Sequence, residues 1–334
     1  MNNFSYTRAT DVAGAAAAIV KDEKFIAGGT NLLDLMKENV MKPSRLVDLN
    51  HLPLDKIEAS SEGGLLLGAL VTNADTAWNA QVEQRYPLLS RAILAGASPQ
   101  LRNMATDGGN LLQRTRCYYF YDPATPCNKR APGSGCSAIR GYNRINAIVG
   151  ASLNCIAVHP SDMCVALAAL DATIHVTGTN GDRKIAFEDF HRLPDDTPET
   201  DTNLRPDEVV TAIELPAKGF PEHFAYLKIR DRASYAFALV SVAVGLEMDG
   251  NIIKEARIAM GGVAHKPWRS TAVEAMLARK EANSVNFRRA AEALLFGAKG
   301  YGHNDFKIEL GKRAIVRALQ MAVDKEDNSD RSFS

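Results

Sequence analysis

The chain has no excess of charge of either sign and no long apolar run. Its 334 residues include 39 lysines and arginines against 39 aspartates and glutamates, so the formal net charge is zero. A general nucleic-acid or membrane-surface binder usually carries a basic excess. No apolar run approaches the roughly 18 residues that cross a bilayer, and a hydrophobic content of 46% excludes disordered and collagen-like chains. We therefore expect a globular protein without nucleic-acid binding or membrane insertion.

The N-terminal stretch lacks the basic region that opens a signal peptide. Residues 11–21 are rich in alanine, and we interpret them as a helix and not as an export signal. The chain is therefore expected to be made and folded in the cytoplasm.

Cysteine is absent from most of the chain and is then concentrated in one region. The five cysteines are Cys117, Cys127, Cys136, Cys155 and Cys164. An odd number without a signal peptide does not suit a disulfide framework. The intervals match neither the Cys-x2-4-Cys knuckle of zinc sites nor the short spacing of bacterial ferredoxins. The clustering indicates a metal or cofactor bound by a long loop.

The charge of this region supports an iron–sulfur centre. Residues 111–147 contain six basic residues against one acid, Asp122. Four thiolates on an iron–sulfur cube leave a net negative charge that nearby cations stabilise. A solvated basic loop with incidental cysteines is the alternative. Cys164 differs from the other four because it falls in a predicted apolar helix, where a small buried thiol is normal.

Two glycine pairs are each followed by asparagine and two leucines, in GGTNLLD from Gly28 and GGNLLQ from Gly108. Paired glycines let a ligand approach the backbone closely and expose N–H groups that hold phosphate oxygens. Neither loop has the Rossmann fingerprint or the lysine of a P-loop. Together they indicate a dinucleotide pyrophosphate site with Thr30, Asn31 and Asn110 as side-chain partners, and ordinary tight turns are the alternative.

Helical and strand patterns alternate through the first half of the chain, which indicates an α/β architecture. Residues 111–147 have little apolar periodicity and predict a long functional loop. Ser161 and Asp162 open an apolar helix, and Asn180-Gly181 predicts a hairpin turn. The helices and strands expected before residue 112 are 11–21, 31–38, 75–85 and 88–94, and 24–27, 45–49 and 65–71. Later strands are expected at 224–229, 238–248 and 252–260, with helices at 271–278, 287–296 and 310–323.

Several segments resemble the FAD-binding subunits of the xanthine dehydrogenase/molybdenum hydroxylase family. They are AGGTNLLDLMK (27–37), ASPQLRNMATDGGNLLQ (97–113), HPSDMCVALAALDA (159–172) and GGVAHKPWR (261–269). Residues 114–136 and 231–243 are similar to the [4Fe-4S]-containing flavoprotein subunit of bacterial aldehyde oxidoreductases of the periplasmic, three-subunit type. The resemblance covers nearly the whole chain.

The resemblance implies an α/β (α+β) fold of two FAD-binding subdomains and a small C-terminal lobe with a three-stranded antiparallel sheet. The subdomains would be 1–56 and 57–218, the second carrying a [4Fe-4S] loop insertion at about 111–158. The lobe would be 222–326, followed by a polar tail at 327–334.

The resemblance also implies the cofactor contacts. The cluster ligands would be Cys117, Cys127, Cys136 and Cys155, with Cys164 outside the set. The FAD contacts would be Phe25, Ile26, Ala27, Gly28, Gly29, Thr30, Asn31, Leu32, Leu33, Thr106, Gly108, Gly109, Asn110, Leu112, Ser161, Asp162 and Lys228. We interpret His159 as structural, and Trp268 as packing within the lobe or a contact with another subunit.

The function implied is that of an electron-transfer subunit. In the similar enzymes a large partner subunit with a molybdenum cofactor oxidises an aldehyde with water to a carboxylic acid. Electrons pass through two [2Fe-2S] clusters on a small partner subunit to this FAD, and then to an external acceptor. Because similar complexes are exported folded on a partner's signal, we expect a periplasmic location by co-transport, with the cytoplasm as the alternative.

Three other functions remain open. A self-sufficient flavin oxidase would turn over substrate as an isolated chain. A xanthine dehydrogenase-like subunit would serve a hydroxylase acting on an N-heterocycle. A scaffold whose cysteines bind zinc would be colourless.

Overall fold

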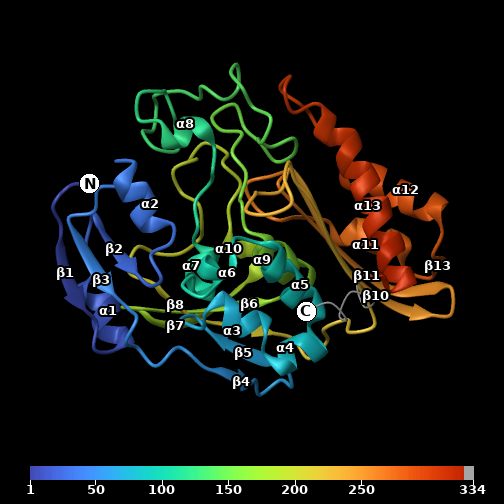
Figure 1. Cartoon of the computed structure of the whole chain (residues 1–334), viewed down its shortest axis with the longest axis horizontal. Coiled ribbons are helices and arrows are strands. Elements are labelled where there is room, and N and C mark those ends of the chain that lie inside the picture. Colours follow the sequence, from blue (N-terminus) through green and yellow to red (C-terminus); the bar gives the residue numbers. More distant parts are fainter. Residues whose placement is uncertain (327–334) are drawn as a thin grey trace.

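The computed structural model describes residues 1–326, and its strands form three β-sheets that follow one another along the chain (Figure 1). The predicted polar tail at 327–334 lies outside the described residues. The mixed α/β architecture confirms the fold class expected from the sequence. Among residues 1–326, no helix combines the length and the apolarity needed to cross a membrane.

The first sheet is parallel, with the strand order β1 (Ser5–Arg8), β3 (Arg45–Asp48), β2 (Glu23–Ile26). Parallel neighbours need crossover connections, and α1 (Val12–Ala18) and α2 (Leu32–Lys37) lie in them. The side chain of Asp11 caps α1 by accepting a hydrogen bond from the N–H of Gly14. Strand β2 therefore ends at Ile26, just before the glycine pair that begins at Gly28.

The second sheet is antiparallel, with the order β4 (Ile57–Ala59), β5 (Leu65–Gly68), β8 (Val209–Leu215), β6 (Thr173–Gly178), β7 (Gly181–Ala186). The turn predicted at Asn180-Gly181 joins β6 to β7, and Gly181 has a φ of +90°. Its helices are α3 (Asn73–Ala77), α4 (Ala80–Arg85), α5 (Pro87–Ala95), α6 (Pro99–Arg102), α7 (Asp107–Leu111), α9 (Asp162–Ala169) and α10 (Phe187–Phe190).

One expected helix, 75–85, is in fact two. The side chain of Asn79 accepts hydrogen bonds from the N–H groups of Gln81 and Val82, so it begins α4 and separates it from α3. Asparagine competes with the helical backbone in this way and is favoured at an N-cap.

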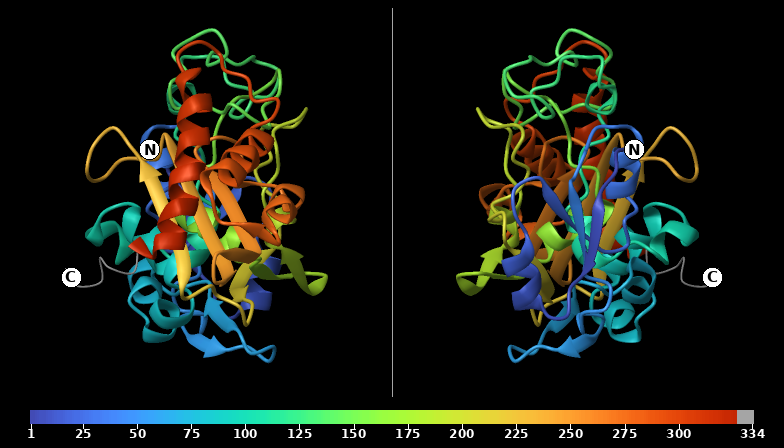
Figure 2. Two further views of the ribbon diagram at one scale, coloured as in Figure 1. Left: turned by 90° about the vertical axis from the view of Figure 1, so that its right-hand side faces the viewer. Right: turned by 90° about the vertical axis from the view of Figure 1, so that its left-hand side faces the viewer.

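The third sheet is antiparallel, with the order β12 (Trp268–Arg269), β11 (Ile252–Gly261), β10 (Val240–Asp249), β9 (His223–Ile229), and β13 (Lys280–Glu281) beside β11. The three long strands match those expected, and the two short strands extend them. On one face lie α11 (Thr271–Leu277), α12 (Ser284–Leu294) and α13 (Phe306–Asp324) (Figure 2).

The other face of the third sheet packs on α9, which lies between the second and third sheets. Every residue of α9 is buried, and four of its eight residues are alanine or cysteine in the run CVALAA. Strand β10 alternates large and small side chains, and a Cβ added at Gly261 on β11 would lie 2.5 Å from a methyl of Val165. Small residues on both elements therefore allow the close approach.

Residues 112–161, between α7 and α9, form the cysteine loop. Its only helix is α8 (Tyr118–Tyr121). The loop rises above the junction of the three sheets, beside the first turns of α13 (Figure 1). This agrees with the long loop predicted from the sequence.

Candidate functional site

The first glycine loop meets, backbone to backbone, the turn that leads into the second glycine loop. A Cβ added at Gly28 would lie 1.9 Å from the carbonyl oxygen of Met104 and 3.3 Å from Cα of Ala105. Gly29 has a φ of +70°, which other residues rarely adopt. The structure therefore brings together the two segments that carry the predicted FAD contacts, 25–33 and 106–112, and the close approach requires glycine at position 28.

Side-chain hydrogen bonds hold the second glycine loop in place. Thr106 caps α7 by accepting from the N–H of Gly109. Asn110 donates to Oδ1 of Asn73 at 2.6 Å and accepts from the hydroxyl of Ser161 at 2.6 Å. Asn110 and Ser161 were predicted as FAD contacts, and here they also hold the loop against α9.

Asn31 has a similar bracing role in the first loop. Its Oδ1 accepts from the backbone N–H of Arg114 at 2.8 Å, and its Nδ2 donates to the hydroxyl of Tyr121 at 3.3 Å. That hydroxyl donates in turn to Asp34 of α2 at 3.2 Å. The first glycine loop is therefore joined directly to the cysteine loop.

Lys228 and Asp162 form a buried ion pair, although they lie 66 residues apart. The ammonium of Lys228 lies 2.8 Å from Oδ2 of Asp162 and donates to the carbonyl of Ala95 at 2.9 Å. The hydroxyl of Tyr226 donates to Oδ1 of Asp162 at 2.6 Å. The structure thus brings two predicted FAD contacts together, and Tyr226 is hydrogen-bonded to one of them, Asp162.

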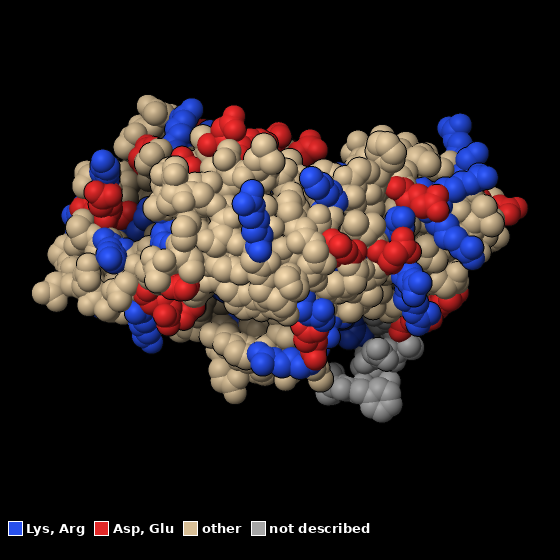
Figure 3. Space-filling model, turned by 90° about the horizontal axis from the view of Figure 1, so that it is seen from above, with Lys and Arg blue, Asp and Glu red and all other residues tan. Residues whose placement is uncertain are grey.

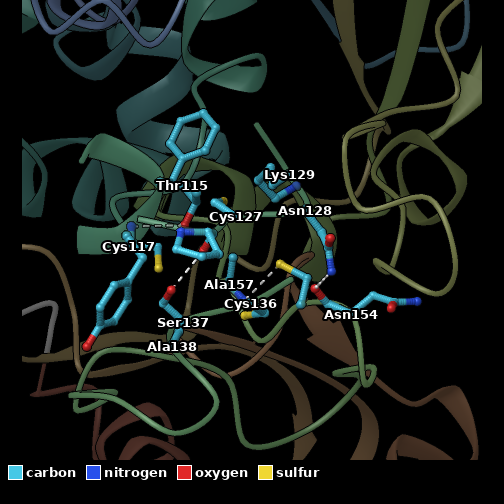
Figure 4. A pocket seen from close by; sticks show the side chains of 14 residues that line it. Thr115, Cys117, Cys127, Asn128, Lys129, Cys136, Ser137, Ala138, Asn154 and Ala157 are labelled. Carbon is cyan, nitrogen blue, oxygen red and sulfur yellow. Dashed lines mark hydrogen bonds between the residues drawn. The ribbon is translucent and has the colours of Figure 1, made fainter. Parts of the chain in front are cut away.

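The four cysteines predicted as cluster ligands line a single cavity in the cysteine loop (Figure 4). Cys127 and Cys136 face each other across an antiparallel backbone bridge. Cys117, Cys127 and Cys155 are buried, Cys136 is partly exposed, and none forms a disulfide. Cys164 lies instead in the core of α9, as expected for a structural thiol.

These four sulfur atoms are not gathered as closely as the ligands of a single metal ion. Within residues 1–326, no three of the four sulfurs lie mutually within 4.8 Å. A tetrahedral zinc ion with bonds of about 2.3 Å would hold its sulfurs about 3.8 Å apart. Four thiols spread more widely around one cavity fit the ligand set of a [4Fe-4S] cube.

Hydrogen bonds to sulfur complete the cavity. Nδ2 of Asn146 lies 3.5 Å from Sγ of Cys117, and the N–H of Ala157 lies 3.4 Å from Sγ of Cys155. Burial raises the pKa of the Cys155 thiol to about 12, and the nearby ammonium of Lys129 opposes that rise. The donors and the cation act against burial and in the direction of the thiolate, which is the form that binds iron.

The six basic residues of the predicted loop do not share one role. Only Lys129 lines the cavity among the lysines and arginines that the structure describes. Arg130 donates to backbone carbonyls of α8 and holds the loop, and Arg144 pairs with Asp231 at 2.8 Å. Of the six, Lys129 therefore places a buried ammonium at the cavity, and the others lie away from it.

Residues from the C-terminal lobe clamp the cysteine loop. The ammonium of Lys307 donates to the carbonyls of Asn146 at 2.7 Å and Gly262 at 2.5 Å. The side chain of Asn304 donates to the carbonyl of Ala147 at 2.9 Å. Burial lowers the pKa of Lys307 to about 7. This clamp, Asn304 and Lys307, fixes the segment that also carries the Asn146 donor.

A second group of potential metal ligands lies behind the second glycine loop. Ligand atoms of His159, Cys164 and His191 lie within 4.8 Å of one another. However, Nδ1 of His159 accepts from the N–H of Ser161 at 3.4 Å, so in the neutral ring the proton lies on Nε2. Nε2 of His191 donates to the carbonyl of Leu111 at 2.8 Å. We interpret the two rings as packing that supports α7, in agreement with the structural role predicted for His159.

Sequence reasoning missed Tyr226, Asn146 and the clamp, and it missed Asp201, whose carboxylate pairs with the ammonium of Lys129 at the cavity. No local pattern marks them, because each acts through a partner distant in sequence. For Lys129 the signal was present, since it stands beside Cys127 in the basic loop, but nothing distinguished it from its neighbours.

Comparisons with known proteins find similarity along nearly the whole chain. Residues 2–218 match the family described as FAD binding domain in molybdopterin dehydrogenase, and residues 225–322 match CO dehydrogenase flavoprotein C-terminal domain. The aldehyde oxidoreductase FAD-binding subunit PaoB of Escherichia coli is 50% identical over 96% of this chain and 99% of its own length. The glyceraldehyde dehydrogenase medium chain of Sulfolobus acidocaldarius is 30% identical over 84% of this chain and 83% of its own.

Solved structures give the same result. Carbon monoxide dehydrogenase from Hydrogenophaga pseudoflava has a chain that superposes with a TM-score of 0.75 at 25% identity, covering 96% of this chain and 97% of that one. Quinoline 2-oxidoreductase from Pseudomonas putida 86 gives a TM-score of 0.73 at 25% identity, covering 97% and 98%.

Proposed function

Because the chain belongs to the family of FAD-binding subunits of molybdenum hydroxylases, we propose that it is the electron-transfer subunit of an aldehyde oxidoreductase. In this proposal the chain carries FAD and a [4Fe-4S] cluster. A large subunit with a molybdenum cofactor oxidises an aldehyde to a carboxylic acid, with water as the source of the added oxygen. The chain takes up electrons from the [2Fe-2S] clusters of a small subunit and delivers them from FAD to an external acceptor.

The observation that carries the proposal is the direct connection between the glycine-loop site and the four-cysteine cavity. Asn31 joins the two through Arg114 and Tyr121. Leu35 of α2 also packs in one apolar cluster with Cys117. When bound, FAD supplies reversible one- and two-electron chemistry. The chain's own residues bind and orient it through Gly28, Gly29 and the cap of α7.

Three features favour a cluster at the cavity: the four thiols, their separation, and the donors to sulfur. The residues that would hold it are Cys117, Cys127, Cys136 and Cys155. The zinc scaffold is less favoured, because no three of these sulfurs lie mutually within 4.8 Å, as the ligands of one zinc ion would.

The aldehyde substrate is favoured by the 50% identity to the Escherichia coli aldehyde oxidoreductase subunit. A relative named for an N-heterocycle, the nicotine 6-hydroxylase medium subunit of Paenarthrobacter nicotinovorans, is 26% identical. An oxidase that acts alone is disfavoured because several of these relatives are named as subunits or medium chains.

The face that carries the cysteine loop suits contact with a partner subunit. Seen from this side, its middle is largely free of charged side chains (Figure 3). Exposed apolar and aromatic residues lie on the loop, including Leu153 at 92% exposure, Tyr118 and Tyr142. Protein interfaces are depleted of charge and enriched in such side chains.

The test of the proposal is the iron, acid-labile sulfide and flavin content of the anaerobically purified chain. We expect about four iron and four sulfide per FAD. Cys→Ser changes at 117, 127, 136 and 155 should each lower iron and leave flavin bound, whereas the control Cys164→Ser should leave iron unchanged. Flavin without iron would refute the cluster, and a protein without flavin would refute the FAD site.

The periplasmic location is a proposal with its own test. It rests on co-transport with a partner that bears the export signal. Fractionation of cells that express all the subunits should recover the assembled complex in the periplasm. Recovery of the complex only in the cytosol would reject the idea.

A further inference from the structure

We propose that Lys129, together with its counter-ion Asp201, sets the reduction potential of the cluster in the cysteine cavity. The inference rests on the proposed [4Fe-4S] cluster and adds a role for two residues outside its ligand set. Lys129 stabilises the reduced form of the cluster, and Asp201 moderates that effect.

The ammonium of Lys129 is buried at the cavity. Its side chain is 1% exposed, donates to the carbonyl of Pro198 at 2.5 Å and pairs with Oδ1 of Asp201. Figure 4 shows Lys129 among the residues that line the same cavity as the four cysteines. A charge removed from water in this way interacts more strongly with its neighbours than a surface charge does.

Asp201 balances more than one positive charge. Its Oδ2 lies 2.6 Å from Nε of Arg114, and its Oδ1 lies 3.3 Å from Nε2 of His265. Burial opposes ionisation of Asp201, but Arg114, His265 and Lys129 hold its pKa well below the usual range. The group of Arg114, Lys129 and Asp201 therefore carries a net positive charge on the side of the cavity formed by Lys129.

The direction of the effect follows from charge. Uptake of one electron from a reductant makes the cube and its four thiolates one unit more negative, and no bond or proton moves. A neighbouring cation stabilises this form and raises the potential, whereas a neighbouring anion lowers it. Lys129 and Asp201 should consequently have opposite effects, which a merely structural role for either residue would not produce.

The experiment is a redox titration of the anaerobically purified full chain, followed by electron paramagnetic resonance of the reduced cluster. Lys129→Gln should make reduction roughly tenfold less favourable, a shift of about 59 mV for a one-electron couple. The isosteric Asp201→Asn should shift the potential in the opposite direction. Arg140→Gln, which removes an exposed cation from the same loop, is the control and should leave the potential unchanged.

The outcomes separate this inference from the proposed function. Opposite shifts in the two variants, with wild-type iron content, support the inference. An intact cluster whose potential is unchanged in both variants would overturn it and leave the proposed function standing. A wild-type chain without iron would overturn both. If Lys129→Gln loses iron, Asp201→Asn decides, and an unchanged or lowered potential in that variant rejects the inference.

Discussion

The close approach of the two glycine loops makes Gly28→Ala the sharpest test of the FAD site. The added Cβ would lie 1.9 Å from the carbonyl oxygen of Met104 and 2.9 Å from its carbonyl carbon. Ordinary contact distances between heavy atoms are about 3.5–4.0 Å. The two backbone segments must therefore separate by at least about 1 Å, because neither atom belongs to a flexible side chain.

The cost of such overpacking is about 1–3 kcal/mol. In the FAD-free protein the loops can part and relieve most of it, so stability should change little. FAD bound across both loops requires the loops to come together again, so the cost of overpacking then weakens FAD binding. We expect FAD to bind roughly tenfold to a hundredfold more weakly, since about 1.4 kcal/mol corresponds to a factor of ten.

The assay is titration of FAD into the FAD-free protein, followed by quenching of flavin fluorescence, with thermal melting as a check of folding. The control is Gly14→Ala in α1, far from both glycine loops, whose Cβ would lie 3.1 Å from the carboxylate of the cap residue Asp11. Its FAD affinity should equal that of the wild type. A folded Gly28→Ala protein that bound FAD within twofold of the wild type would refute the shared site.

Three further predictions concern buried polar groups. Lys228→Met should destabilise the fold by about 3–5 kcal/mol in urea unfolding, because the carboxylate of Asp162 stays buried without its partner. Adding Asp162→Asn to this variant should recover part of the lost stability. Losses of stability that simply add in the double variant would contradict this. Burial raises the pKa of Asp107 to about 7. The contribution of this carboxyl group to folding stability is therefore complete below its ordinary pKa of 3.8 and is lost as the pH rises towards 7. Asp107→Asn should remove that slope from unfolding measured between about pH 4 and 7, and an unchanged slope would be evidence against it. Asn146→Ala should lower the cluster potential in the same redox titration, because it removes the donor to Cys117; an unchanged potential with full iron content would argue against that role.

Local sequence signals predicted much of the fold. Ser161 was recognised as the start of α9, and its hydroxyl does accept from the N–H of Cys164 at 3.0 Å. Asn180-Gly181 was recognised as the hairpin turn. Strand β1 was missed because all four of its residues are exposed, so no alternation marks it. Strand β8 was missed although it lies at the centre of the second sheet, because it stands between two proline-rich loops.

The candidate site was predictable to the extent that its residues cluster along the chain. The spacing of the glycine pairs and of the four cysteines indicates which kind of ligand each set could bind. No such spacing marks Asp201 and Lys307. Their partners lie 72 and 161 residues away in the sequence, and only tertiary packing brings them together. A sequence pattern can indicate which side chains bind a cofactor, but not which distant charge tunes or braces them.

The clamp has a bearing on the order in which the protein matures. A ribosome releases the cysteine loop some 140 residues before Asn304 and Lys307, and until then the carbonyls of 146 and 147 lack these donors. Both donors come from the last part of the lobe to be made, and α13 also packs on β9, the strand that carries Lys228. We therefore expect iron and sulfide to enter the proposed cluster site only after synthesis of the chain has finished.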